Sequence, residues 1–289
     1  MPALTLVAPA KLNLYLHVLG KREDGYHDLE SLVVFTEFAD RLTVEPAEDL
    51  SLVVEGEFAE ASGAAENNLV LKAARALQSK LPQRPGAKIT LTKHIPVGAG
   101  LGGGSADAAA TLRGLNRFWG MDLSYRDLLW MAGTLGADVP MCIASTPAIA
   151  RGTGTELVPF LTHWPRISLL LVHPRVALLS KDVYGALELP KDARPSAEIP
   201  LHHPAILLDS LKSTRNDLQR AAIVREAKVA QVLLALETLQ PAPSLVRMSG
   251  SGACCFAIYT DHTVANKAAD SIARNHPDWW VKVTELKRD

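Results

Sequence analysis

The sequence predicts an α+β fold built from two domains. Its first half reads, in order, as three strands, a helix, a strand, a glycine-rich loop and two helices. A doubly wound parallel sheet would alternate strictly between strand and helix, so this order favours α+β. The chain has 289 residues. At roughly 150 residues per domain, that length suggests two domains.

The elements of the first half follow from hydrophobic spacing. Leu12, Leu14 and Leu16 alternate with polar and aromatic residues, which is typical of a half-buried strand. Helical segments show apolar residues three or four positions apart instead. Ser124 and Asp127 form a capping box where one helix starts. We therefore predict strands at residues 12–16, 32–38, 50–55 and 87–92, and helices at residues 68–80, 106–119 and 124–135.

The second half continues the α+β pattern. It opens with a strand at residues 167–173, and a proline-rich segment at residues 190–204 is expected on the surface. Two helices should follow. The remaining predicted elements are strands at residues 245–248 and 254–259, a helix at residues 264–275 and a last strand.

Composition excludes several classes of protein. The formal net charge is −1, whereas a nucleic-acid binder normally needs a basic face. No apolar run approaches the roughly 18 residues that span a bilayer, and the N-terminal residues do not resemble a signal peptide. The three cysteines form no CxxC motif, so we expect reduced thiols and no structural metal. We expect a cytoplasmic protein with no nucleic-acid or membrane partner, and its oligomeric state stays open.

The most informative segment is a glycine-rich loop at residues 96–106. Five glycines occur within residues 98–104, directly before a helix. Glycines let consecutive backbone N–H groups converge on an anion, and a helix N-terminus adds further donors. Ser105 could bind a phosphate or Mg²⁺ with its hydroxyl. The sequence therefore predicts a phosphate site here rather than a simple turn.

Known phosphate-loop patterns do not fit this loop well. No lysine follows the glycines, as a Walker A loop requires. Gly98, Gly100 and Gly103 match G-x-G-x-x-G, but the first strand of a βαβ unit does not precede them directly. Two shorter motifs, at residues 151–155 and 249–253, could contribute to the same phosphate site, although each alone is typical of a turn.

Lys11 and Asp138 are the candidates for acid–base chemistry. Lys11 starts an alternating strand, and Asp138 follows a helix directly. An aspartate can accept the proton of an attacking alcohol, and a nearby lysine stabilises phosphoryl oxygens. Taken alone, each residue is more typical of an ordinary surface or turn residue, and only their proximity would make the chemistry specific.

Three segments together resemble the motifs of the GHMP small-molecule kinases. They are Pro9-Ala-Lys-Leu-Asn13, the glycine-rich loop and Ser249-Gly-Ser-Gly-Ala253. Gly25-Tyr-His27, the triple glycine and Leu135-Gly-Ala-Asp-Val-Pro140 resemble one branch of that family. This branch phosphorylates the 2-hydroxyl of 4-diphosphocytidyl-2-C-methyl-D-erythritol in non-mevalonate isoprenoid synthesis. The resemblance implies a ribosomal-protein-like N-terminal domain at residues 1–157 and a ferredoxin-like substrate domain at residues 158–289.

The resemblance also implies roles for individual residues. Asp138 would be the base and Lys11 its electrostatic partner, with ATP and Mg²⁺ as the substrate complex. The implied ATP-binding residues are Asn68, Lys93, Pro96, Val97, Gly98, Ala99, Gly100, Leu101, Gly102, Gly103, Gly104, Ser105 and Ala106. Of these, Asn68 and Lys93 would lie on the adenine side. The implied substrate-binding residues are Asn13, Tyr26, His27, Ser180 and Tyr184. The two tyrosines would stack on cytosine, and His27 would read its edge.

Three other functions stay open at this point. The chain could be another GHMP kinase, acting on mevalonate, phosphomevalonate or homoserine. It could be a dinucleotide-dependent oxidoreductase, given the match to G-x-G-x-x-G. It could also bind nucleotides without catalysis.

Overall fold

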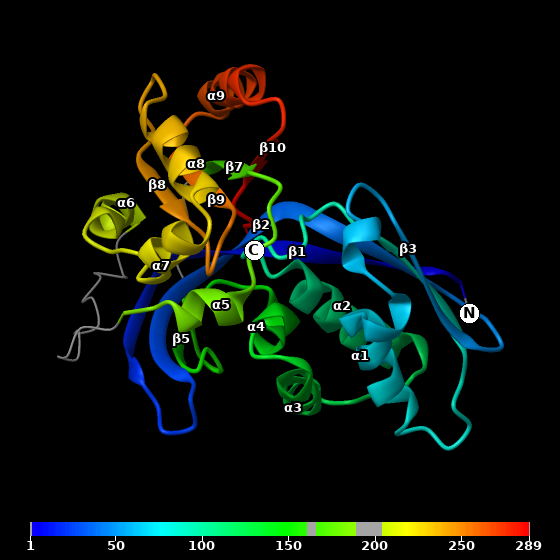
Figure 1. Cartoon of the computed structure of the whole chain (residues 1–289). Coiled ribbons are helices and arrows are strands. Elements are labelled where there is room, and N and C mark those ends of the chain that lie inside the picture. Colours follow the sequence, from blue (N-terminus) through cyan, green and yellow to red (C-terminus); the bar gives the residue numbers. More distant parts are fainter. Residues whose placement is uncertain (1, 161–165, 189–203, 289) are drawn as a thin grey trace. The chain divides into compact units, whose positions relative to one another are not determined.

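The computed structural model describes residues 2–160, 166–188 and 204–288, and it divides into two compact units (Figure 1). Unit 1 comprises Met1–Lys11, Phe38–Val97 and Gly102–Ser145. Unit 2 comprises Leu12–Glu37, Gly98–Leu101 and Thr146–Asp289. The units interleave in sequence because two long strands, β1 (Leu4–Lys21) and β2 (His27–Glu45), each contribute to both. The domain boundary between residues 157 and 158, which the family resemblance implies, stays a prediction.

Unit 1 combines strands with a layer of helices. β4 (Ala87–Thr92) pairs antiparallel with the end of β2 and parallel with β3 (Leu50–Glu55). The helices lie together on one side of these strands (Figure 1). They are α1 (Leu69–Gln78), α2 (Gly103–Phe118), α3 (Tyr125–Leu135) and α4 (Val139–Ala144), with short 3-10 turns η1 (Glu60–Ser62) and η2 (Ala65–Asn67) before α1.

Unit 2 contains a small hairpin and a four-stranded sheet. The start of β2 pairs antiparallel with β5 (Ala148–Gly152), which turns back into β6 (Glu156–Pro159). The second sheet has the order β10-β7-β9-β8, with every neighbouring pair antiparallel. Its strands are β7 (Ser168–His173), β8 (Leu245–Met248), β9 (Cys255–Tyr259) and β10 (Trp280–Glu285).

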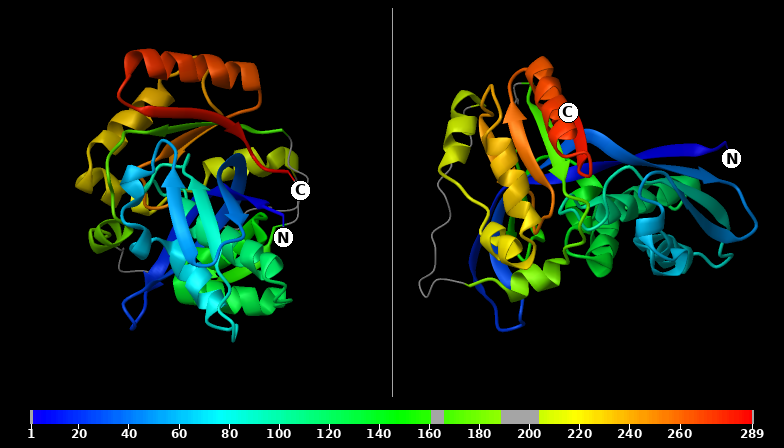
Figure 2. Two further views of the ribbon diagram at one scale, coloured as in Figure 1. Left: turned by 90° about the vertical axis from the view of Figure 1, so that its right-hand side faces the viewer. Right: turned by 45° about the horizontal axis from the view of Figure 1, so that its top comes forward.

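This second sheet has a ferredoxin-like arrangement. Between β7 and β8 lie α5 (Ser180–Gly185), α6 (Pro204–Lys212), α7 (Leu218–Arg225) and α8 (Lys228–Glu237), and α9 (His262–Asn275) joins β9 to β10. Numbered in chain order, the strands run 4-1-3-2, the order of a split β-α-β unit. Figure 2 shows α9 alongside β7 and β10. Leu170 and Val172 of β7 belong to the same buried core as Leu236 of α8 and Ile272 of α9.

The predicted fold class is confirmed, and most strong elements lie where the sequence placed them. β3, β4 and α3 match their predicted ranges. α2 starts at Gly103 rather than at residue 106, because Gly102 adopts the left-handed conformation (φ 64°, ψ 20°) and turns the chain into the helix early. The two long strands extend well beyond residues 12–16 and 32–38, since their continuous burial hides the alternating pattern.

Several short elements were missed or miscounted. α4, α5, β5 and β6 have four to six residues each, too few for a periodic signal. Two helices were predicted before β8, but the described residues hold α5 to α8 there. Most of the proline-rich segment, residues 189–203, lies outside the described residues. Within the described part of the chain, no helix has the length and apolar character to cross a membrane.

Candidate active site

The start of α2 in unit 1 is built to leave backbone donors available. The helix begins at Gly103, and its N-cap, Gly102, has no side chain to cap it. The first N–H groups of a helix have no partner within the helix, and the helix dipole makes this end attractive to anions. Ser105 lies half-buried in this first turn. Among the described residues its hydroxyl has no hydrogen-bond partner.

Lys11 and Asp138 meet beside this helix start. Lys11 Nζ lies 3.5 Å from Asp138 Oδ2, and the lysine side chain is 6% exposed while the aspartate is 43% exposed. A Cβ added at Gly102 would lie 2.6 Å from Lys11 Cγ, so the lysine stem rests directly on the loop backbone. Asp138 occupies the N-cap position of α4, yet its side chain makes no capping hydrogen bond. The carboxylate is therefore accessible for chemistry rather than committed to its own helix.

Arg113 on α2 holds the element that carries Asp138. Its guanidinium donates to the carbonyls of Cys142 (2.6 Å) and Ile143 (3.0 Å) at the end of α4. It also donates to the Val7 carbonyl on β1, at 3.4 Å. Burial lowers the pKa of Arg113. One side chain thus ties α4 and β1, which bear Asp138 and Lys11, to α2.

The glycines at residues 98–101 belong to unit 2, where they lie on the motif at residues 249–253. Ala99 accepts a hydrogen bond from the Cys254 N–H (3.1 Å), and Gly100 accepts one from Ser249 Oγ (3.0 Å). A Cβ at Gly100 would lie 2.2 Å from the Ser249 carbonyl oxygen, so only glycine fits there. The structure thereby brings two of the three glycine motifs together.

Asn13 lies buried in unit 2, two residues after Lys11 on β1. Its amide Nδ2 donates to Ser31 Oγ at 2.7 Å, and its backbone N–H donates to Ser249 Oγ at 3.3 Å. Ser31 Oγ in turn donates to the Tyr15 carbonyl at 2.6 Å. These bonds fix the orientation of the Asn13 amide.

Asn216 organises the motif at residues 249–253 from the side. Its amide Nδ2 donates to the carbonyls of Met248 and Gly250, both at 2.8 Å. Ser251 Oγ lies 2.7 Å from Ser180 Oγ, at the first residue of α5. The predicted Ser180 is therefore one half of a hydroxyl pair that sequence reasoning did not detect.

His27 and Tyr184, both predicted to contact the substrate base, lie against each other in unit 2. Their ring centroids are 5.1 Å apart, and the rings are inclined by 28°. Burial, followed by the charge of Lys21, lowers the pKa of His27, which favours the neutral ring. Tyr26 is 63% exposed. The two stacked rings supply a flat aromatic surface with an exposed tyrosine nearby in sequence.

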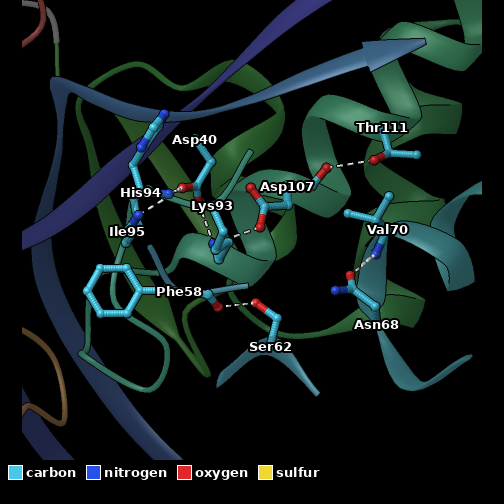
Figure 3. Close-up of polar contacts among 10 residues, drawn as sticks. All are labelled: Asp40, Phe58, Ser62, Asn68, Val70, Lys93, His94, Ile95, Asp107 and Thr111. Atoms are coloured by element: carbon cyan, nitrogen blue, oxygen red, sulfur yellow. Dashed lines mark hydrogen bonds and ion pairs between the residues drawn. The ribbon is translucent and has the colours of Figure 1, made fainter. Parts of the chain in front are cut away.

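Lys93 and Asn68, predicted near adenine, have structural partners in unit 1. Asn68 caps α1 by accepting a hydrogen bond from the Val70 N–H (Figure 3). Lys93 is 3% exposed, and its ammonium pairs with Asp40 and Asp107. A role for either residue toward adenine stays a prediction.

The motif at residues 151–155 forms the turn between β5 and β6. The Gly154 N–H donates to the Arg151 carbonyl at 3.0 Å, and Thr153 Oγ1 lies 3.3 Å from Thr155 Oγ1. Arg151 donates to Glu30 Oε2 at 2.9 Å. These contacts fit the turn that the motif alone suggested.

Sequence reasoning missed the residues that support the site. They are Ser31, Asp40, Asp107, Arg113 and Asn216, whereas Ser251 lies in a motif that the sequence singled out. Asp107, inside the predicted α2, carried the clearest signal, because a charged residue on the apolar face of a helix needs a partner. The others act through pairings between segments far apart in sequence, which no local pattern reveals.

Comparison with known proteins defines the class of enzyme to which the chain belongs. The model of the GHMP kinase N-terminal domain matches residues 68–146, and that of the GHMP kinase C-terminal domain matches residues 205–278. The chain belongs to the GHMP kinase family and is an ATP-dependent small-molecule kinase. This membership replaces the dinucleotide-dependent oxidoreductase alternative, which rested on the G-x-G-x-x-G match.

Individual relatives indicate which branch of the GHMP kinase family the chain resembles. The chain is 45% identical to the 4-diphosphocytidyl-2-C-methyl-D-erythritol kinase of Paramagnetospirillum magneticum, over 99% of both chains. It is 43% identical to the kinase of the same name from Rhodospirillum rubrum, over 98% of this chain and 92% of that one. A solved 4-(cytidine 5'-diphospho)-2C-methyl-D-erythritol kinase superposes with a TM-score of 0.80 at 32% identity, over 99% of this chain and 100% of that one. A homoserine kinase from Cytophaga hutchinsonii shares the fold, with a TM-score of 0.74 at 19% identity over 99% and 95% of the two chains.

Proposed function

We propose that this kinase transfers the γ-phosphoryl group of ATP to the 2-hydroxyl of 4-diphosphocytidyl-2-C-methyl-D-erythritol. The full-length identity to kinases named for this substrate supports the choice of alcohol. The contact of Lys11 with Asp138 beside the start of α2 supports the type of chemistry, and this one observation carries the mechanism. The reaction would belong to isoprenoid precursor synthesis in the cytoplasm.

Asp138 would act as the general base. Its Oδ2 would accept the proton of the 2-hydroxyl while that oxygen attacks the γ-phosphorus. The bond from the γ-phosphorus to the bridging oxygen would break, and ADP would leave with that oxygen. Phosphoryl transfer has a loose transition state, so aligning the two oxygens matters more than strong basicity.

Lys11 and the first turn of α2 would stabilise charge. The ammonium lies beside Asp138, and its stem rests on Gly102, next to the backbone donors at Gly103 and Gly104. These groups are fixed before the reaction starts, which is the condition under which electrostatic stabilisation is most effective.

ATP would be bound as its Mg²⁺ complex. Mg²⁺ usually keeps several waters and takes only one or two protein ligands, so the half-buried Ser105 hydroxyl fits as a ligand. Bound there, the ion would neutralise charge on the triphosphate. Among the described residues, no cluster of three His, Cys, Asp or Glu side chains suggests a resident metal.

Unit 2 supplies candidates for recognising the cytidyl group. Tyr184 would stack on the cytosine, with Tyr26 on its other face, and a neutral His27 would bond to the base edge. Asn13 would orient the methylerythritol part, and the Ser180–Ser251 hydroxyl pair would contact a substrate phosphate.

The test is ATP turnover with Mg²⁺ and each of three alcohols. We expect ADP release with the cytidyl substrate and none with mevalonate or homoserine. ADP release only with mevalonate or homoserine would move the protein to another branch of the family. Failure to release ADP with any alcohol would contradict the proposed reaction.

The role of Asp138 is tested by Asp138→Asn. Removing a general base should lower kcat by about 100- to 10,000-fold, while ATP still binds. Asp122→Asn is a matched control, because Asp122 is exposed and has φ 52°, a conformation that asparagine tolerates well. A kcat for Asp138→Asn equal to that of the control would rule out the base.

A further inference from the structure

A buried charge cluster made of Asp40, Lys93 and Asp107 lies in unit 1, outside the residues proposed to do chemistry (Figure 3). Lys93 Nζ donates to Asp107 Oδ2 at 2.8 Å and to Asp40 Oδ2. The three side chains are 4%, 0% and 2% exposed, in the order Lys93, Asp40, Asp107. Charged groups this deeply buried are rare and need a reason.

The cluster joins the two ends of the glycine-rich loop. Lys93 follows β4 and precedes the loop, whereas Asp107 lies on α2, just after it. Their ion pair therefore spans residues 94–106 and fixes the distance between the segment that leads into the loop and the helix that leaves it.

Asp40 on β2 fixes the leading segment itself. Its Oδ1 accepts hydrogen bonds from the backbone N–H groups of His94 (2.5 Å) and Ile95 (2.8 Å). Its other oxygen pairs with the Lys93 ammonium. The two residues immediately before Pro96 are thus held by one carboxylate.

The cluster also touches the first residue of α2. A Cβ added at Gly103 would lie 2.9 Å from Lys93 Nζ and 3.0 Å from Ile95 Cγ2. The ammonium thus lies directly against the backbone whose donors face the anion site. A shift of Lys93 would displace this backbone.

The composition of the cluster is not what fold stability alone would select. Two carboxylates share one ammonium, and the buried Asp107 Oδ1 has no hydrogen-bond partner within the described part of the chain. Burial, and then the Asp40 carboxylate, raise the pKa of Asp107 to about 7, although Lys93 opposes the shift. Apolar residues of similar volume often stabilise such a position as well or better.

We propose that Asp40, Lys93 and Asp107 are positioning residues that hold the glycine-rich loop and the first turn of α2 in the geometry that receives ATP. None of the three is a catalytic residue, because the ammonium and both carboxylates are enclosed and engaged with one another. The proposal rests on ATP binding at this loop. It does not depend on which alcohol is phosphorylated.

The decisive variant is Lys93→Met, which keeps the length of the side chain and removes its charge. ATP affinity is measured by titration calorimetry without an acceptor alcohol, and kcat and both KM values are measured in the turnover assay. We expect the Kd and KM for ATP to rise about 10- to 100-fold, the scale of a displacement near 1 Å. The KM for the alcohol should stay within about twofold, since only the ATP loop is displaced.

Two further variants keep the proposal testable if Lys93→Met folds poorly. Asp107→Asn keeps an acceptor for Lys93 and should retain near-normal ATP affinity. The triple variant Asp40→Asn, Lys93→Met, Asp107→Leu removes every charge, so it should fold, yet it should bind ATP as weakly as Lys93→Met.

Thr111→Val is the matched control on α2. Thr111 is fully buried one turn beyond Asp107, and its hydroxyl donates to the Asp107 carbonyl at 2.8 Å. This variant should lose some stability and keep its ATP affinity.

The outcomes separate the two proposals. The comparison uses only those of the Lys93→Met and triple variants that melt cooperatively. If the wild type binds ATP and these variants bind it equally well, the positioning role is overturned, while the proposed kinase reaction is unaffected. If the wild type binds ATP but phosphorylates none of the alcohols, only the proposed reaction fails. A wild type that does not bind ATP would overturn both.

Discussion

Two lysines flank the start of α2, and they differ in what surrounds them. Lys11 lies against Gly102 and pairs with Asp138 at 3.5 Å, where the carboxylate is 43% exposed. Lys93 lies against the next residue, Gly103, and shares two fully buried carboxylates. The first arrangement leaves exposed the carboxylate that we propose as the base, whereas the second encloses its charged groups. In our proposals the same residue types therefore support chemistry in one place and loop geometry in the other, and exposure distinguishes the two.

Among the changes that test this contrast between the lysines, the largest effect is expected on Lys11. Lys11→Met should lower kcat by about 100- to 1,000-fold, because a fixed charge next to the transferring phosphoryl group is lost. Stability should change by less than about 1 kcal/mol, since the partner carboxylate is partly solvated. Steady-state kinetics and urea unfolding on the same preparation measure both. An unchanged kcat would remove the functional contrast between the two lysines.

A smaller effect on activity is expected from a change at Gly102, the backbone position against which Lys11 lies. Gly102→Ala places a Cβ at φ 64° and 2.6 Å from Lys11 Cγ, so it should cost about 1 to 2 kcal/mol of stability and lower kcat. Gly133→Ala is the matched control, because Gly133 is exposed in α3 with nothing within 4 Å of an added Cβ. The control should gain up to about 1 kcal/mol and keep full activity. Equal behaviour of the two variants would show that the close approach to Lys11 does not matter.

The buried cluster should also give the stability of the protein a specific pH dependence. Because the pKa of Asp107 is raised to about 7 from 3.8, the folded state binds more protons than the unfolded state between these values. This contribution to stability is complete below about pH 4 and is lost as the pH rises toward 7. Relative to Asp107→Asn, the wild type should therefore show a free energy of unfolding that falls as the pH rises from 4 to 7. Parallel urea-unfolding profiles for the two proteins from pH 4 to 7 would contradict the raised pKa.

The glycine-rich loop and the two members of the proposed catalytic pair could be singled out from the sequence. The density of glycines before a helix predicts an anion site from backbone geometry alone, and α2 follows as expected. The meeting of Lys11 with Asp138 could not be derived from spacing, since 126 residues separate them. The family resemblance suggested it, and unit 1 brings the two side chains together.

The residues that support the site, such as Asp40, could not be predicted from the sequence for a physical reason. Asp40 reads locally as a polar residue on a strand, and its burial arises only because β2 pairs with β4 and the segment after β4 turns back onto it. Lys93 was expected near adenine only because the family resemblance implied it, and the fold encloses its charge. The interleaving of the two units could not be predicted either. The local sequence predicts only short strands at residues 12–16 and 32–38, whereas β1 and β2 each extend into both units.

The most direct test of the central claim compares Lys11→Met and Lys93→Met in one assay. ATP Kd, kcat and melting temperature are measured for both variants beside the wild type. We predict that Lys11→Met loses kcat with ATP affinity and melting temperature nearly intact, and that Lys93→Met loses ATP affinity and melts lower. If both variants lose the same quantity in the same proportion, the two lysines do not have separate roles.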